Sequence, residues 1–189
     1  MHHLALFASG TGSNARKIMD YFKTSDTVRV SLVVSNNKDA GVLAIAESFG
    51  VPTHLIARKS FYDTPDLLAV LAEHEVDFIA LAGFMWLVPP YLVQAFPRRI
   101  LNIHPALLPK FGGKGMYGMH VHEAVQASGA SESGITIHYV NERYDEGDIL
   151  FQASCVLEVG ESPAQIAKKV QILEHEWYPK VIESALSTM

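Results

Sequence analysis

Short apolar runs alternate with helix-like stretches through the first hundred residues of the chain. Five runs have the composition of buried strands: Leu4–Ala8, Val28–Val34, Thr53–Ala57, Asp77–Ala82 and Ile100–His104. Four helices are expected between them: Asn14–Phe22, Ala40–Phe49, Pro65–Glu75 and about Pro90–Phe96. Thr64 is the expected N-cap of the third helix, and Gly50 is the expected stop of the second. This alternation predicts a parallel sheet with helices on both faces.

The pattern changes after residue 104. Two strand runs, Ile135–Val140 and Ile149–Leu157, are separated only by Asn141–Asp148, which is too short for a helical crossover and predicts an antiparallel hairpin. Ser162-Pro163-Ala164-Gln165 has the form of a capping box and opens a long C-terminal helix. The predicted fold is therefore α/β, doubly wound and Rossmann-like. It has a mostly parallel sheet, a C-terminal antiparallel hairpin and a long C-terminal helix.

Composition narrows the class of protein. With 189 residues, 49% apolar and 19% charged, residues 1–189 are expected to form one globular domain. No apolar run is long enough to cross a bilayer, so no membrane partner is expected. Cys155 is the only cysteine, which excludes an internal disulfide and fits a cytoplasmic location. The net charge of -5 and the lack of Lys/Arg clusters argue against a nucleic-acid partner.

Asn102 and His104 are the first candidates for chemistry. In a strand, their side chains point to the same face, roughly 6–7 Å apart along it. An amide can donate to an oxyanion, and an imidazole can carry a proton near neutral pH. Pro105 follows directly and helps to end the strand. Because strand ends of α/β sheets usually hold the chemistry, the pair predicts an acyl-transfer site.

A glycine turn, Ser9–Ala15, joins the first strand to the first helix. Its two glycines and the helix start favour a phosphate site, although the turn could instead be purely structural with Ser13 as the N-cap. Gly10, Gly12 and Ala15 also match the dinucleotide fingerprint. That alternative requires an acidic residue at the end of the second strand, where the chain has Ser35-Asn36-Asn37. A monophosphate therefore fits better than a dinucleotide.

A histidine in an acyl-transfer site needs a carboxylate to orient it. The loop of the predicted hairpin contains four candidates, and residue type alone does not choose among them: Glu142, Asp145, Glu146 and Asp148. His138, on the preceding strand, is expected to be structural. His120-Val121-His122 invites a metal reading, but no further ligand falls at a typical spacing, so no metal is expected.

Taken together, the motifs resemble those of the phosphoribosylglycinamide formyltransferases, folate-dependent enzymes of purine synthesis. Five blocks carry the resemblance, in this order: Ser9-Gly10-Thr11-Gly12-Ser13-Asn14, Ala82-Gly83-Phe84-Met85, Leu101-Asn102-Ile103-His104-Pro105-Ala106-Leu107-Leu108-Pro109, Tyr144-Asp145-Glu146-Gly147 and Gln171-Ile172-Leu173-Glu174-His175. The resemblance extends from Leu4 to about Ile182. It implies that the formyl group of 10-formyltetrahydrofolate is transferred to the amine of glycinamide ribonucleotide.

The resemblance also implies roles for individual residues. The phosphoribosyl part of the acceptor would be bound by Gly12, Ser13, Asn14, Gln171 and Glu174. The folate would be bound by Met85, Trp86, Leu87, Val88, Asn102 and Val140. The catalytic trio would be Asn102, His104 and Asp145. In that trio a protonated His104 and Asn102 stabilise the oxyanion, while Asp145 keeps the imidazolium favourable.

Two alternatives share the Asn-Ile-His-Pro chemistry: a formyltetrahydrofolate hydrolase and another 10-formyltetrahydrofolate-dependent formyltransferase, such as one acting on methionyl-tRNA. Only small-molecule partners are expected, with the chain a monomer or a homodimer. Three features depart from the family. Trp86 stands where many relatives have Arg, and Thr64 occupies a position often given to Arg in the preceding loop. About five extra residues within Lys114–Met119 are expected to lengthen a loop.

Overall fold

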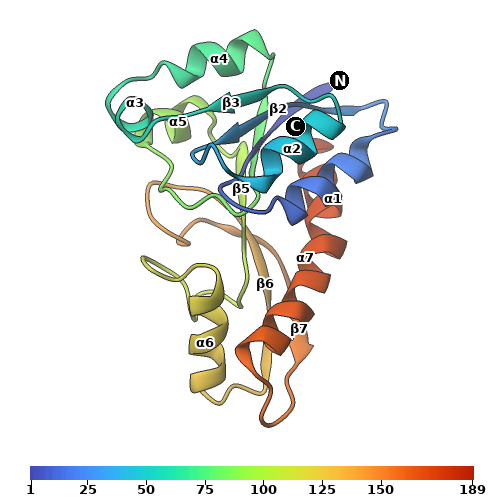
Figure 1. Cartoon of the computed structure of the whole chain (residues 1–189), viewed down its shortest axis with the longest axis vertical. Coiled ribbons are helices and arrows are strands. Elements are labelled where there is room, and N and C mark those ends of the chain that lie inside the picture. Colours follow the sequence, from blue (N-terminus) through green and yellow to red (C-terminus); the bar gives the residue numbers. More distant parts are fainter.

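A seven-stranded sheet runs through the molecule in the order β3-β2-β1-β4-β5-β6-β7 (Figure 1). The computed structural model describes residues 1–189. The strands are β1 His2–Phe7, β2 Val28–Ser35, β3 Thr53–Leu55, β4 Phe78–Leu81, β5 Ile100–His104, β6 Glu132–Tyr139 and β7 Ile149–Val156. The first five are parallel, β6 pairs antiparallel with β5, and β7 pairs antiparallel with β6. The predicted mostly parallel sheet with an antiparallel hairpin at its end is confirmed.

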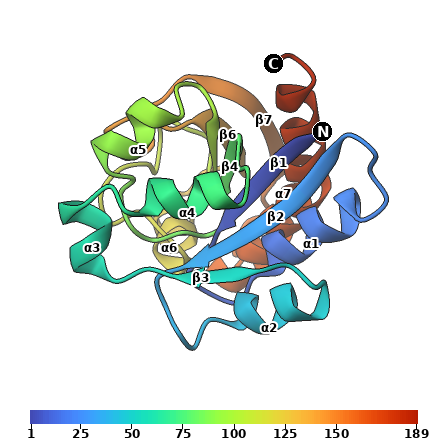
Figure 2. The same ribbon diagram turned by 90° about the horizontal axis from the view of Figure 1, so that it is seen from above.

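Seven helices cover the sheet. They are α1 Ser13–Phe22, α2 Gly41–Ser48, α3 Arg58–Asp63, α4 Leu67–Glu73, α5 Pro90–Ala95, α6 Met119–Ala127 and α7 Pro163–Leu186. Buried side chains of α1, α2 and α7 belong to one core, and those of α3, α4 and α5 belong to a second core on the opposite face (Figure 2). The two cores confirm the doubly wound arrangement, because helices lie on both faces of one sheet.

The central strand β1 shows why the sheet is apolar on both sides. Leu4 and Leu6 enter the core beneath α1 and α7, whereas Ala5 and Phe7 enter the core beneath α3, α4 and α5. Successive side chains of a strand point to opposite faces, so a strand covered on both faces is a continuous apolar run. This is the run that the sequence shows at Leu4–Ala8.

Three details of the helices differ from the sequence prediction. Helices α3 and α6 were not expected. Thr64 does not N-cap α4: Asp66 occupies that position, while the Thr64 hydroxyl lies 2.7 Å from an Asp66 carboxylate oxygen. Gly50 follows the end of α2 with a positive φ of 67°, as predicted for a helix stop.

The long helix α7 begins with the predicted capping box, in which the Ser162 and Gln165 side chains each bond to the other residue's backbone N–H. Its Tyr178 is fully buried, and its hydroxyl lies 2.9 Å from the Leu81 carbonyl and 3.1 Å from the Leu101 carbonyl. These carbonyls belong to β4 and β5, so Tyr178 ties α7 to the ends of two neighbouring strands.

The order of the strands fixes where a site can form. After β1 the chain builds β2 and β3 on one side and then crosses to β4 on the other side of β1. A crevice opens at such a switch point, outside the carboxyl ends of the strands. The glycine turn follows β1 at this edge, and residues 82–88 follow β4. No helix of the chain is both long and apolar enough to cross a membrane.

Candidate active site

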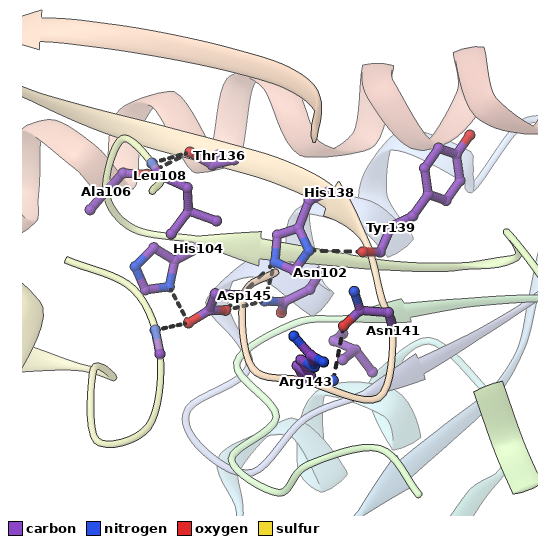
Figure 3. Close-up of polar contacts among 12 residues, drawn as sticks. Asn102, His104, Ala106, Leu108, Thr136, His138, Tyr139, Asn141, Arg143 and Asp145 are labelled. Atoms are coloured by element: carbon purple, nitrogen blue, oxygen red, sulfur yellow. Dashed lines mark hydrogen bonds and ion pairs between the residues drawn. The ribbon is translucent and has the colours of Figure 1, made fainter. Parts of the chain in front are cut away.

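One cavity of about 850 Å³ lies at the carboxyl ends of the central strands and is lined by all the site residues that the family resemblance implies. At one end lie the glycine turn and the face of α7 that carries Gln171 and Glu174. Asn102, His104 and Asp145 line the cavity with them (Figure 3). The residues implicated in folate binding, Met85 to Val88 and Val140, are also part of the lining. Segments far apart in the sequence are thus brought to one space.

The glycine turn leaves the start of α1 open. Gly12 is the N-cap residue, with a left-handed φ of 79°, and no side chain caps the helix. A Cβ at Gly12 would lie 2.8 Å from Val42, so both the backbone conformation and the close approach of α2 require glycine. The first N–H groups of a helix have no partners within it, and the helix dipole favours an anion there. The N-cap is therefore Gly12 and not Ser13, which is the first residue of the helix, and phosphate binding at this turn stays a prediction.

Helix α7 contributes a second wall beside this helix start. The Asn14 amide donates to a Glu174 carboxylate oxygen over 3.1 Å, and the Gln171 amide donates to the Ser13 hydroxyl over 3.4 Å. Burial raises the pKa of Glu174, and the hydrogen bond from Asn14 only partly opposes this. The result is a polar wall of two amides, a hydroxyl and a carboxyl group next to the uncapped start of α1.

Strand β5 presents Asn102 and His104 on one face, as the two-residue spacing predicts. On the neighbouring strand β6, His138 lies opposite Asn102 and Thr136 lies opposite His104. Both histidines are almost completely buried, with 3% and 2% of their surfaces exposed. Four polar side chains are therefore held on one face of two paired strands.

Of the four acidic residues in the β6–β7 loop, only Asp145 reaches this face. One of its carboxylate oxygens lies 3.5 Å from Nδ1 of His104, and the other lies 3.6 Å from Nε2 of His138. The Gly113 amide donates to Asp145 over 2.9 Å. Asp145 itself has a positive φ of 57°, which turns its side chain inward from the loop.

The other three acids lie away from the histidines. Asp148 pairs with Arg98 at 2.6 Å, Glu146 pairs with Arg143 at 3.2 Å, and Glu142 is exposed. The choice that the residue types alone left open is thus made by the geometry of the loop.

Hydrogen bonds assign the protons of His138 and Asn102 (Figure 3). Nδ1 of His138 lies 2.9 Å from the Tyr139 carbonyl, which can only accept, so this nitrogen carries a proton. With that proton on Nδ1 alone, Nε2 of His138 accepts from the Asn102 amide over 3.1 Å. The same amide lies 3.4 Å from an Asp145 oxygen. His138, expected to be only structural, therefore fixes the orientation of Asn102.

Burial decides the charge states of the pair. Burial by itself would raise the pKa of Asp145, but hydrogen bonds and the nearby imidazoles stabilise the carboxylate more, and its pKa lies below the usual value. Burial lowers the pKa of His104, and the opposing effects of Asp145 and of the Phe111 carbonyl do not overcome it. Removal from water thus favours the neutral imidazole of His104 in the free site, and the protonated form that stabilises an oxyanion stays a prediction for the reaction itself.

An aromatic cluster packs behind residues 82–88, the part of the cavity lining that follows β4. Trp86 packs near Phe61, Tyr62 and Phe84, with ring centroids 5.6–6.2 Å apart. The Arg58 guanidinium lies 5.8 Å from the Trp86 ring. The Met85 amide donates to the Ser9 hydroxyl over 2.9 Å, which joins this wall to the glycine turn.

The inserted segment Lys114–Met119 does more than lengthen a loop, because every one of its residues lines the cavity. Its last residue begins α6, which also brings His122 to the lining. His122 is buried, burial lowers its pKa, and its Nδ1 has no hydrogen-bond partner. His120 is exposed beside Glu123, and no group of three or more His, Cys, Asp or Glu side chains is arranged to hold a metal.

Sequence reasoning missed the brace that holds the turn after His104. The Thr136 hydroxyl donates to the Ala106 carbonyl over 2.7 Å and accepts from the Leu108 amide over 2.9 Å (Figure 3). The Gln152 amide donates to the same hydroxyl and to the Leu108 carbonyl. No sequence signal marked Gln152, because it lies in an alternating edge strand where polar residues are expected to face solvent.

Comparison with known proteins is consistent over nearly the whole chain. The family model described as formyl transferase matches residues 2–182. The chain is 37% identical to the phosphoribosylglycinamide formyltransferase of Bacillus subtilis (strain 168), covering 98% of this chain and 95% of that protein. It is 48% identical to the chloroplastic phosphoribosylglycinamide formyltransferase of Arabidopsis thaliana, covering 95% of this chain but only 63% of that protein.

Solved structures agree with the sequence comparisons. The crystal structure of phosphoribosylglycinamide formyltransferase from Anaplasma phagocytophilum superimposes with a TM-score of 0.90 at 35% identity, covering 98% of this chain and 87% of the other. The predicted Rossmann-like α/β fold is therefore shared with solved proteins of this kind.

Proposed function

We propose, from the premise that this chain belongs to the formyl transferase family, that it transfers the formyl group of 10-formyltetrahydrofolate to the amine of glycinamide ribonucleotide. The products are formylglycinamide ribonucleotide and tetrahydrofolate. Family membership rests on the match over residues 2–182. The choice of acceptor rests on the site and on the names of the relatives.

One observation carries the proposal: an anion-binding helix start and an acyl-transfer trio line the same cavity. A phosphate at the start of α1 leaves the rest of the ribonucleotide to extend along α7 toward Asn102 and His104. Glu174 and Gln171, on successive turns of α7, are suited to hydroxyl groups of a ribose. Met85 to Val88, with Val140, are suited to a flat heterocycle such as the pterin of the folate.

The trio supports direct transfer. The acceptor amine attacks the formyl carbon, and the carbonyl becomes a tetrahedral oxyanion. The Asn102 amide donates to this oxygen in exchange for its long contact with Asp145, and such a donor is worth roughly 3–4 kcal/mol in an acyl-transfer site. Neutral His104 takes the proton that the amine loses, and Asp145 stabilises the imidazolium.

Collapse of the intermediate completes the reaction. The carbonyl re-forms, the bond from carbon to the folate nitrogen breaks, and His104 returns its proton to that nitrogen. A histidine with a pKa below its ordinary value is suited to this sequence, because it starts neutral and becomes charged only while the intermediate exists. We place the reaction in the cytoplasm, a location that the single unpaired cysteine supports.

The test is to incubate the purified chain with 10-formyltetrahydrofolate in three arms: glycinamide ribonucleotide, initiator methionyl-tRNA and no acceptor. Tetrahydrofolate is followed with time, and the acceptor is analysed by mass spectrometry. The proposal expects tetrahydrofolate and formylated ribonucleotide in equal amounts in the first arm alone. Equal release of tetrahydrofolate without acceptor would identify a hydrolase, and formylation of the tRNA would identify a different transferase.

A further inference from the structure

The two ring nitrogens of His104 have partners of different kinds. Nε2 lies 2.8 Å from the backbone carbonyl of Phe111, and Nδ1 lies 3.5 Å from a carboxylate oxygen of Asp145. A carbonyl oxygen only accepts, so Nε2 carries a proton in every charge state that keeps this bond. When His104 is neutral it has no second proton, and Nδ1 then has a free lone pair.

We propose that the backbone of Phe111–Gly113 is a positioning element that makes Nδ1 of His104 the nitrogen which exchanges a proton in the reaction. The inference deepens the proposed formyl transfer and rests on it. In serine-protease triads the carboxylate fixes the proton on one nitrogen and the other nitrogen works. Here a backbone carbonyl fixes the tautomer, and the carboxylate stands beside the working nitrogen.

The same segment also holds the carboxylate. The Gly113 amide donates over 2.9 Å to the Asp145 oxygen that faces Nδ1. Two backbone groups, two residues apart, therefore set the positions of both members of the pair. If the segment shifts, the tautomer of His104 and the orientation of Asp145 change together.

The residue between these two groups could carry a side chain only if its neighbours moved. A Cβ on Gly112 would overlap Cδ2 of Leu108 and lie 3.3 Å from Cβ of Asp145. Cβ contacts this close force a neighbour to move, and one of the two neighbours here is the carboxylate residue itself. Glycine at this position lets the segment pass close enough to contact both partners.

The position of Nδ1 suits a nitrogen that gains a proton and then loses it during the reaction. Nδ1 is on the side of the ring that faces Asp145 (Figure 3). Nε2 faces the Phe111 carbonyl instead. The N–H bond of the attacking amine breaks and an Nδ1–H bond forms. The contact with Asp145 changes from a lone pair against a carboxylate to an ion pair. The Nδ1–H bond then breaks as the leaving folate nitrogen gains the proton.

Other titratable groups around His104 oppose this charge rather than share the role. His138 on β6 and His122 on α6 both face it, and a second positive charge on either would disfavour the imidazolium. His138 holds its own proton on Nδ1 by a bond to Tyr139. Asp145 is thus the one carboxylate that stabilises the proton on Nδ1.

The test is nitrogen-15 NMR of histidine side chains in the ligand-free protein, with the His104 signals assigned by their loss in His104→Gln. The spectra are recorded while the pH is raised until one ring nitrogen of His104 loses its proton, and the expected result for the unaltered chain is that Nδ1 loses it and Nε2 keeps it. Gly112→Ala is expected to populate the other tautomer and to lower kcat by about tenfold or more, with KM for both substrates nearly unchanged. A proton found on Nδ1 of neutral His104 in the unaltered chain overturns the proposal, even if Gly112→Ala fails to fold.

Gly129→Ala is the matched control. Gly129 has a positive φ of 67° and open space around it, and it lies past the end of α6, outside the cavity lining. It is expected to lower Tm while keeping the His104 tautomer and kcat, which separates loss of stability from loss of position. A fall in kcat for Gly112→Ala with the tautomer unchanged also overturns the proposal. The NMR measurement needs no substrate, so it stays decisive if formyl transfer itself is not observed.

Discussion

Asp145→Asn removes one negative charge from the centre of the site and changes little else. An asparagine oxygen can still accept from the Gly113 amide, so the loop keeps its anchor. What is lost is the attraction between the carboxylate and the imidazolium that forms on His104 during turnover. The variant therefore tests whether the ion pair, rather than the shape of the loop, drives the reaction.

The expected size follows from the distance. At 3.5 Å, and with an effective dielectric constant of about 20, two unit charges attract by about 4–5 kcal/mol. The side chains of His104 and Asp145 are only 4% and 10% exposed, so solvent screens the pair little. Because each 1.36 kcal/mol is a factor of ten, kcat is expected to fall by about a thousandfold.

The assay is the initial rate of tetrahydrofolate formation at saturating concentrations of both substrates. Glu146→Gln is the matched control: it removes a charge from the next residue, which is exposed and pairs with Arg143. The control is expected to keep kcat within about twofold, as a surface pair contributes little. If Asp145→Asn retained kcat within about threefold, or if both variants lost activity equally, the assigned role of the ion pair would be refuted.

Three further outcomes follow from the same contacts. Glu174→Gln is expected to raise KM for the ribonucleotide by roughly tenfold with little change in kcat, as loss of a charge-assisted hydrogen bond predicts; an unchanged KM counts against ribose binding by α7. His122 has a folded pKa below its unfolded value, so its contribution to stability is present above about pH 6.5 and is lost as the pH falls toward the folded pKa. Urea unfolding at about pH 7 and pH 5 should therefore show that acidification lowers the unfolding free energy less in His122→Gln than in the unaltered chain. An identical loss in the two proteins would contradict the burial effect. Tyr178→Phe removes the buried hydroxyl that bonds to the Leu81 and Leu101 carbonyls and is expected to cost about 1–2 kcal/mol of unfolding free energy; no change in a thermal melt would show that the bridge is not stabilising.

Periodicity predicted the seven strands and five of the seven helices, and it missed α3 and α6. Only Phe61 is buried in α3, which is a single short helix before the predicted start of the next one. In α6 the buried residues Val121, His122 and Val125 include a histidine, so the apolar stripe from which a helix is recognised is interrupted by a polar residue. The central strands β1 and β4 are buried along most of their length and read as continuous apolar runs.

The candidate site divides in the same way. Asn102 and His104 were predictable because they lie two apart at the end of a strand, and the glycine turn was predictable from its position between β1 and α1. Asp145 could be chosen only through the family resemblance, because four acids occupy one loop and the choice depends on its positive φ and on a bond from Gly113. Such contacts join loops that are distant in the sequence, and local patterns do not contain them.

The positioning of His104 shows why part of the mechanism leaves no trace in residue types. Its Nε2 is held by the Phe111 carbonyl and its carboxylate partner by the Gly113 amide, and every residue other than proline has both of these backbone groups. Such contacts therefore depend on the path of the backbone and not on the type of side chain at Phe111 or Gly113. The one residue type that this path constrains is Gly112, where an added Cβ would press on Asp145. A glycine beside a catalytic pair is thus a signal that backbone groups position the pair, and here it indicates which nitrogen of His104 carries the resting proton.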